Sequence, residues 1–230
     1  MSPHVMISPS LQCAPLLHLG QAVRILEAAQ ADMLHIDIMD GGFVPNLALA
    51  FDHLTQLKAY TPLPLDIHLM LQNPGQYLPR TLLSTGDRVC FHIENKCDPG
   101  PLIVQIRAAG CRAGLAISPS TPVSALQPCL SSLDFVLVMA VQPGFAGQAF
   151  IPETLKKIAL LHAMAKDQNP KLLISVDGGI DAAWGAQCIA HGADILIAGA
   201  KAIFFPDRDL LIETQSFIRK MREAYDDARR

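Results

Sequence analysis

Short apolar runs recur along the chain, and each is followed by a loop and then by an amphipathic stretch. Apolar runs of about four to eight residues are typical of buried strands, and the longer amphipathic stretches are typical of helices. The pattern predicts strands at residues 5–8, 33–39, 65–70, 88–93, 112–117, 134–139, 172–176 and 194–198. It predicts helices at residues 21–30, 51–59, 74–83, 102–109, 123–128, 152–165, 182–191 and 209–228.

Eight strands that alternate with helices predict an α/β protein, a single (β/α)8 TIM barrel, in which residues 1–230 form one catalytic domain. No linker or low-complexity segment divides the chain. The main alternative is an open, doubly wound sheet. The first strand is not followed by the Gly-x-Gly-x-x-Gly motif of such folds, and the strand number equals that of a barrel, so the barrel is favoured.

The strand predicted at residues 33–39 carries polar groups on one face. Side chains alternate across a strand, so His35, Asp37 and Met39 share one face, whereas Leu34 and Ile38 belong to an apolar face. Burying even a neutral polar group without a partner costs roughly 2–7 kcal/mol. A divalent metal ion is one way to compensate an imidazole and a carboxylate in so hydrophobic a segment.

In a barrel of this kind, polar residues at the carboxyl ends of the strands face the active site. This rule selects Ser10, His35, Asp37, His68, His92 and Asp177. Two histidines and two aspartates that converge from three strands suit zinc, iron, manganese or cobalt. We expect His92 to be structural or to line the pocket, because its strand offers no second ligand, and we expect Asp66 to be structural and Asp40 to form a turn.

Three glycine-containing loops follow the last three predicted strands, at residues 143–148, 177–179 and 198–200. Small residues let backbone N–H groups approach an anion, and the loops after strands 7 and 8 are the usual phosphate site of this fold. We therefore expect a phosphorylated substrate. The residues expected to contact it here are Gly144, Phe145, Ala146, Gly147, Gly178, Gly179, Gly199 and Ala200. Lys201 is either a further contact or a solvated surface lysine.

Composition narrows the functional classes. The net charge is −3 and no basic cluster appears, so we expect no nucleic-acid partner. No run approaches the roughly 18 apolar residues of a membrane span, and the first residues do not resemble a signal peptide. The six cysteines are scattered without a Cys-x-x-Cys pair, which is typical of reduced thiols in a cytoplasmic enzyme.

Several segments resemble the ribulose-phosphate 3-epimerase family. They are residues 8–10 (SPS), 35–41 (HIDIMDG), 43–46 (FVPN), 66–70 (DIHLM), 139–148 (MAVQPGFAGQ) and 176–180 (VDGGI), and the likeness extends from about residue 7 to residue 205. The resemblance implies the same barrel and metal-dependent epimerisation at C3 of a ketose phosphate, D-ribulose 5-phosphate to D-xylulose 5-phosphate in the pentose phosphate pathway. It also implies a homo-oligomer, a dimer or a hexamer.

The resemblance further implies a role for individual residues. The metal ligands would be His35, Asp37, His68 and Asp177, with zinc the first choice of ion. Asp37 and Asp177 would be the acid/base pair, Ser10 and His68 would contact the substrate, and the late glycine loops would bind its phosphate. Two carboxyl groups on opposite sides of a substrate can remove a proton from one face and return one to the other through an enediolate.

Three methionines, Met39, Met70 and Met139, lie near the predicted reacting level. Two roles are open for them: a soft wall that keeps water from the enediolate, or ordinary core packing.

The sequence departs from the family pattern with Gly42 in place of His, Gln142 in place of Asn, Ala146 in place of Gly and Ala200 in place of Ser. Residues 12–15 (QCAP) also replace the Ser-Ala-Asp-Phe that is usual after the first strand of the family. Segments 10–11, 145–148 and 150–153 look closer to the allulose-6-phosphate 3-epimerase branch. The alternative substrate is therefore D-allulose 6-phosphate, interconverted with D-fructose 6-phosphate.

Two other functional classes agree less well with the sequence. A phosphate-binding barrel lyase or isomerase of tryptophan biosynthesis would explain the glycine loops but not the histidines and aspartates. A non-enzymatic sugar-phosphate binding protein would be expected to lack one of the ligands, and all four are present.

Overall fold

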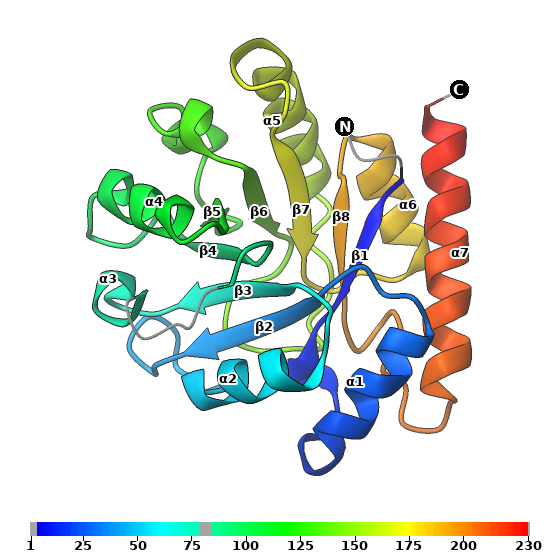
Figure 1. Ribbon diagram of the computed structural model, residues 1–230. Helices are drawn as coiled ribbons and strands as arrows, with labels where there is room; N and C mark the ends of the chain where they lie inside the picture. The colour runs from blue at the N-terminus through cyan, green and yellow to red at the C-terminus, as the bar shows by residue number, and fades with distance from the viewer. Residues whose placement is uncertain (1–3, 79–83, 230) are drawn as a thin grey trace.

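Eight parallel strands form one sheet in the order β1-β8-β7-β6-β5-β4-β3-β2 in the computed structural model, which describes residues 4–78 and 84–229. A parallel bridge between Ser10 and His35 joins the end of β1 to β2 and closes the sheet, so the fold is a single (β/α)8 TIM barrel (Figure 1). The strands are β1 Met6–Pro9, β2 Leu34–Met39, β3 Leu65–Met70, β4 Arg88–His92, β5 Arg112–Ile117, β6 Phe135–Met139, β7 Leu173–Asp177 and β8 Ile195–Ala198.

The helices lie around the outside of the strands (Figure 1). They are α1 Leu19–Ala28, α2 Phe51–Tyr60, α3 Pro74–Tyr77, α4 Pro99–Ala108, α5 Thr154–Gln168, α6 Ala182–Ala190 and α7 Leu210–Ala228. Short 3-10 helices occur at Leu11–Cys13, Leu16–His18, Val123–Leu126 and Leu130–Ser132. The long helix α7 packs against α6 and α1 beside the first and last strands.

The predicted barrel is confirmed, and every predicted strand is present within two residues of its expected ends. The helices differ more. The segment at residues 123–128 is a 3-10 helix and not an α-helix, α5 begins at Thr154 and not at residue 152, and part of the helix expected at residues 74–83 lies outside the described residues. Helix α4 begins at Pro99, three residues early, because Asp98 caps it by accepting a hydrogen bond from Gly100 N–H.

The two faces of the sheet bury different groups. The outward faces of the strands pack against the helices in the main hydrophobic core, to which Leu34, Ile36 and Ile38 of β2 belong. The inward faces fill the barrel itself, where Phe135 and Ile195 lie among a second apolar cluster. The odd-numbered residues of β2 point into this interior, and two of them, His35 and Asp37, are polar. The chemistry-bearing side chains are therefore held inside a packed barrel.

Two further expectations concern the chain as a whole. Within residues 4–78 and 84–229, no helix is both long and apolar enough to cross a membrane. All six cysteines lie in the described part of the chain, and each is a free thiol.

The barrel interior tolerates no added atom at Gly114 of β5. A methyl group at this position would lie 2.5 Å from Cζ of Phe135. The ring of Phe135 cannot withdraw freely, because it is fully buried and the guanidinium of Arg88 lies 4.1 Å from its centre. Glycine at this position is therefore required by the close approach of β5 and β6.

We predict that Gly114→Ala lowers the free energy of unfolding by about 1–3 kcal/mol, the usual cost of overpacking a core. Urea denaturation followed by circular dichroism measures this change. Gly100→Ala is the matched control, because its methyl group would meet only Asp98 Oδ1 at 3.4 Å, an ordinary contact. Equal stability of the two variants would contradict the close packing of the interior.

Candidate active site

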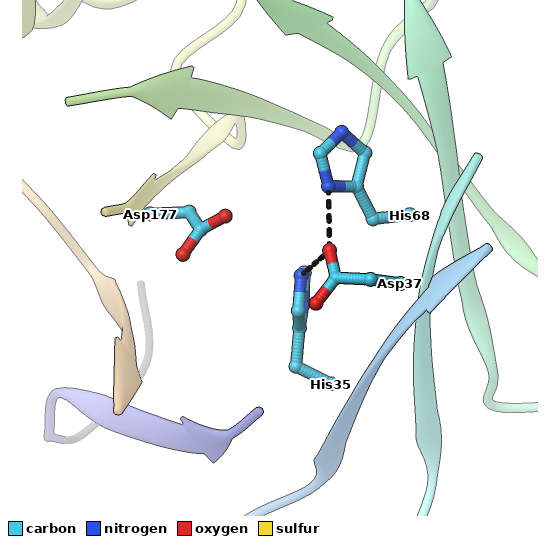
Figure 2. Close-up of side chains that lie close together, drawn as sticks. All are labelled: His35, Asp37, His68 and Asp177. Atoms are coloured by element: carbon cyan, nitrogen blue, oxygen red, sulfur yellow. Dashed lines mark hydrogen bonds and ion pairs between the residues drawn. The ribbon is translucent and has the colours of Figure 1, made fainter. Parts of the chain in front are cut away.

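Four polar side chains meet at the carboxyl ends of three strands. His35 and Asp37 come from β2, His68 from β3 and Asp177 from β7, and one possible ligand atom of each lies within 4.8 Å of those of the others (Figure 2). Oδ1 of Asp37 lies 3.3 Å from Nε2 of His35 and 3.2 Å from Nδ1 of His68. The structure thus brings together all four predicted metal ligands.

Strand register explains why these side chains converge. Asp37 on β2 is paired with His68 on β3, and His35 is paired with Asp66, so alternate residues of both strands face the interior, odd-numbered on β2 and even-numbered on β3. Asp177 is the last residue of β7 and approaches from another side of the barrel (Figure 2). Strand β7 is three positions away from β2 around the barrel, so the two carboxyl groups reach the group of four from different strands.

The buried ring of His35 provides a test of whether these residues fit a metal ion. Its side chain is fully buried, and its Nδ1 lies 2.9 Å from Oδ2 of Asp66. Its Nε2, which points toward the group of four, lies 3.3 Å from Oδ1 of Asp37 but forms no well-aligned hydrogen bond to any described residue. A buried nitrogen left without a good hydrogen bond costs up to about 1–3 kcal/mol. A cation held by two imidazole nitrogens and two carboxylates would satisfy this atom, so the residues fit a divalent transition metal.

The two carboxyl groups have opposite electrostatic environments. Burial raises the pKa of Asp177 to about 7, and the negative charges of Asp37 and Asp66 add to this effect while His35 opposes it. Burial also acts to raise the pKa of Asp37, but the rings of His35 and His68 outweigh it and hold that pKa well below its usual range. Without a cation, one carboxyl group is thus ionised while the other readily keeps its proton.

Asp66 contacts His35 on the side of its ring away from Asp37. Its Oδ2 accepts a hydrogen bond from Oγ of Ser8 at 3.2 Å and contacts His35, and its Oδ1 lies 3.7 Å from Nε of Arg88. The expectation that Asp66 is structural is consistent with these contacts, but its contact with Nδ1 also orients the His35 ring. A carboxylate behind a histidine is the usual partner of a metal-binding imidazole.

His92 lies behind His68 and not on the wall of the cavity. Its Nε2 is 2.9 Å from Nε2 of His68, and its Nδ1 is 2.9 Å from Oε2 of Glu94. Burial lowers the pKa of His92 to about 4. Partial burial acts to raise the pKa of Glu94, but hydrogen bonds from His92, Thr121 and Ser118 lower it to about 2. Sequence reasoning left His92 without a partner and did not consider Glu94.

A cavity opens above the group of four at the carboxyl ends of the strands. Its wall includes Asp37 and Asp177. It also includes all three methionines and the predicted substrate residues other than His68: Ser10, Met39, Met70, Met139, Gly144, Phe145, Ala146, Gly147, Gly178, Gly179, Gly199 and Ala200. Oγ of Ser10 donates a hydrogen bond to Oδ2 of Asp37 at 3.0 Å. His68, predicted to contact the substrate, is fully buried and is not part of the wall.

The glycine loops of this wall depend on backbone shapes that other residues rarely adopt. Gly178 and Gly179 have φ angles of +114° and +64°, and added methyl groups would lie 2.4 Å from Cγ2 of Val141 and 2.5 Å from the backbone N of Phe150. The loop after β6 is also tied to the loop after β2, because Asn46 Nδ2 donates to the carbonyl of Gly144 at 2.7 Å. These loops are therefore close-packed against one another.

Several lining residues were not expected from the sequence. They are Gln12, Cys13, Val141, Gln142, Ile180 and Ile197. Gln148 of the predicted loop at residues 143–148 and the exposed Lys201, which was left open as a contact, also reach the cavity. The carboxyl-end rule could have found Glu94, since it lies two residues after the end of β4. Asp40 forms the expected turn, with its Oδ1 accepting hydrogen bonds from the backbone N–H groups of Gly42 and Phe43.

Comparison with known proteins identifies the family. A sequence profile described as "Ribulose-phosphate 3 epimerase family" matches residues 6–204. Ribulose-phosphate 3-epimerase of Treponema pallidum (strain Nichols) is 39% identical to this chain, over 91% of the chain and 96% of that protein. Ribulose-phosphate 3-epimerase of Aquifex aeolicus (strain VF5) is 32% identical, over 95% of the chain and 98% of that protein.

Among solved structures, the tryptophan synthase subunit alpha of Legionella pneumophila str. Paris superimposes with a TM-score of 0.63 at 18% identity, covering 97% of this chain and 93% of that one. At this identity the likeness shows the barrel fold alone. The relatives and the profile extend over most of the chain and agree with the resemblance of the motifs. The chain belongs to the ribulose-phosphate 3-epimerase family, whose named members are isomerases.

Proposed function

We propose that this protein catalyses the metal-dependent epimerisation at C3 of D-ribulose 5-phosphate to D-xylulose 5-phosphate. The observation that carries the proposal is the pair of carboxyl groups, Asp37 and Asp177, that flanks one cavity beside two buried histidines. The names of its relatives, ribulose-phosphate 3-epimerases, support the five-carbon substrate over the alternative, D-allulose 6-phosphate. The same likeness supports an enzyme over a non-enzymatic sugar-phosphate binding protein.

The reaction requires a proton to leave one face of C3 and another to return to the opposite face. Asp37 and Asp177 come from strands that are three apart around the barrel, so each can address a different face of a substrate bound between them. In one direction Asp37 accepts the proton and Asp177 donates one, and in the other direction the roles reverse. The opposite pKa directions of the two groups suit this division.

His35, Asp37, His68 and Asp177 would hold the divalent cation, with zinc the first choice and iron, manganese or cobalt also compatible with these ligands. When bound, the cation supplies positive charge that stabilises the negative charge developing on the substrate oxygens. Ser10 supports this arrangement, since its hydroxyl holds Oδ2 of Asp37.

The loops after β6, β7 and β8 would bind the phosphate. Their residues line the cavity at one side, and Gly144, Gly178 and Gly179 allow the backbone to approach a ligand closely. Ala200 offers a backbone N–H but no hydroxyl, so the phosphate contact there would come from the main chain alone. Met39, Met70 and Met139 line the same cavity and would limit access of water to the intermediate.

We further propose a compartment, a pathway and an assembly for this enzyme. Residues 1–230 would act as one catalytic domain in the cytoplasm, within carbohydrate metabolism through the pentose phosphate pathway. Its partner would be the small-molecule ketose phosphate. The protein would assemble as a homo-oligomer, either a dimer or a hexamer.

A coupled assay that compares initial rates on D-ribulose 5-phosphate and D-allulose 6-phosphate tests the reaction and the substrate together, with metal content determined on the same sample. A higher kcat/KM for the pentulose phosphate is expected. Faster turnover of the hexulose phosphate would overturn the substrate assignment, and no turnover of either would overturn the proposed reaction.

We predict that Asp177→Asn lowers kcat by at least about 100-fold, since the amide cannot exchange a proton with C3 and general acid–base groups contribute about 10²–10⁴-fold. Steady-state kinetics measure the loss, and circular dichroism checks the fold. Asp181→Asn is the matched control in the same segment, because Asp181 only caps α6 and asparagine is an equally good cap. Near-normal turnover by Asp177→Asn would contradict the acid/base role.

We predict that removal of metal by a strong chelator abolishes epimerisation and lowers the melting temperature, because a cation that binds only the folded chain stabilises it. Re-addition of zinc, iron, manganese or cobalt separately identifies the ions that restore both. His68→Gln should fail to retain metal after gel filtration, whereas His18→Gln, at an exposed position, should retain it. Full activity of the metal-free protein would contradict the proposed dependence.

A further inference from the structure

The far side of His68 is connected to a carboxylate outside the group of four. We propose that Glu94, acting through His92, is a positioning residue that holds His68 in the tautomer whose Nδ1 carries no proton and is open to a cation. The inference rests on the proposed metal site, which it deepens by assigning a function to two residues behind it.

The chain of contacts begins at Glu94, which is held as a hydrogen-bond acceptor. Its Oε1 accepts a hydrogen bond from the backbone N–H of Ser118 at 2.7 Å and another from the hydroxyl of Thr121. Nearby, the ammonium of Lys157 donates to the carbonyls of Ser118 and Pro119. This environment favours the ionised carboxylate, which can only accept. Oε2 therefore requires a proton on Nδ1 of His92, 2.9 Å away.

The protonation of His92 on Nδ1 determines how His92 interacts with His68. Its side chain is fully buried, so the neutral imidazole with a single N–H is favoured. With that proton on Nδ1, its Nε2 can only accept a hydrogen bond. The hydroxyl of Ser118 lies 3.5 Å from Nδ1, but it can rotate to accept or to donate and does not alter this requirement.

His68 must then donate to His92. The two Nε2 atoms are 2.9 Å apart, and since that of His92 accepts, the proton of His68 lies on its Nε2. Its Nδ1 keeps a lone pair, which faces Oδ1 of Asp37 at 3.2 Å. Two acceptors that face each other inside the barrel repel unless a positive charge lies between them.

Counting protons gives the same result. The path from Asp37 through His68 and His92 to Glu94 has three contacts, and two neutral histidines supply two protons. One contact therefore lacks a proton. Asp37 already accepts a hydrogen bond from the hydroxyl of Ser10, and its carboxylate lies 3.3 Å from the ring of His35. We therefore assign the missing proton to the contact between Asp37 and His68, where a cation can take its place.

Substitution of Glu94 by glutamine would reverse the direction of hydrogen-bond donation along the path from Glu94 to Asp37. The amide oxygen would keep the donors Ser118 and Thr121, and the amide NH2 would donate to Nδ1 of His92. His92 would then donate to His68, whose proton would move to Nδ1 and block the ligand atom. Thr121→Val is the matched control, since it removes a donor to the same carboxylate but leaves that carboxylate an acceptor.

The experiment has two readouts on the full-length protein. Zinc affinity, measured by competition with a chelating dye, should fall about 10- to 100-fold in Glu94→Gln, the usual effect of losing an outer partner of a metal ligand, and by less than about threefold in Thr121→Val. Nitrogen-15 NMR of the metal-free wild type should show His68 protonated on Nε2 and His92 protonated on Nδ1.

Unchanged zinc affinity of Glu94→Gln, or a proton on Nδ1 of His68 in the metal-free wild type, would overturn the inference. If Glu94→Gln fails to fold, the NMR spectrum of the wild type still decides it. Failure of the wild type to bind zinc, iron, manganese or cobalt would instead contradict the proposed metal site, while the same spectrum would still report the proton path.

Discussion

The carboxylate of Asp37 is the group on which the arrangement of this barrel mouth depends. It is 4% exposed, and an ion so deeply buried is tolerated only where donors or positive charge surround it. The hydroxyl of Ser10, just after β1, donates a hydrogen bond to it, and ring nitrogens of His35 on β2 and His68 on β3 lie 3.3 and 3.2 Å from it. On the proposed function, a cation held among these groups would complete the compensation of this charge, which therefore depends on residues from three parts of the barrel.

The two histidines are held in corresponding ways. Each presents one ring nitrogen to Asp37, and the other nitrogen leads to a carboxylate, directly to Asp66 for His35 and through His92 to Glu94 for His68. Because an ionised carboxylate only accepts hydrogen bonds, both paths favour an unprotonated nitrogen on the side of the cavity. On the proposed function, the outer residues would thus prepare the site for a cation.

Much of this site could be predicted because strand alternation is strict. The polar face of β2 identified His35 and Asp37, the same parity identified His68, and the carboxyl-end rule added Ser10 and Asp177. The contact between His68 and His92 could not be predicted, since it depends on the rotamers of two rings on neighbouring strands and not on sequence spacing. The early start of α4 was predictable in principle, because Asp98-Pro99 is a typical helix beginning.

The cavity has two parts that are held in place by different interactions: a floor, formed by the polar residues of the strands, and a wall, formed by the loops. The floor is set by charges and hydrogen bonds among strand residues, whereas the wall depends on small residues and on contacts between loops, such as that of Asn46 with Gly144. Gln142, Ala146 and Ala200, which we expect from the resemblance to depart from the family pattern, all belong to the wall. On the proposed function, such changes alter how a phosphate and a sugar of given length are held, while the proton transfer between Asp37 and Asp177 is left unchanged. Reaction type and substrate choice can therefore diverge independently in a barrel of this kind.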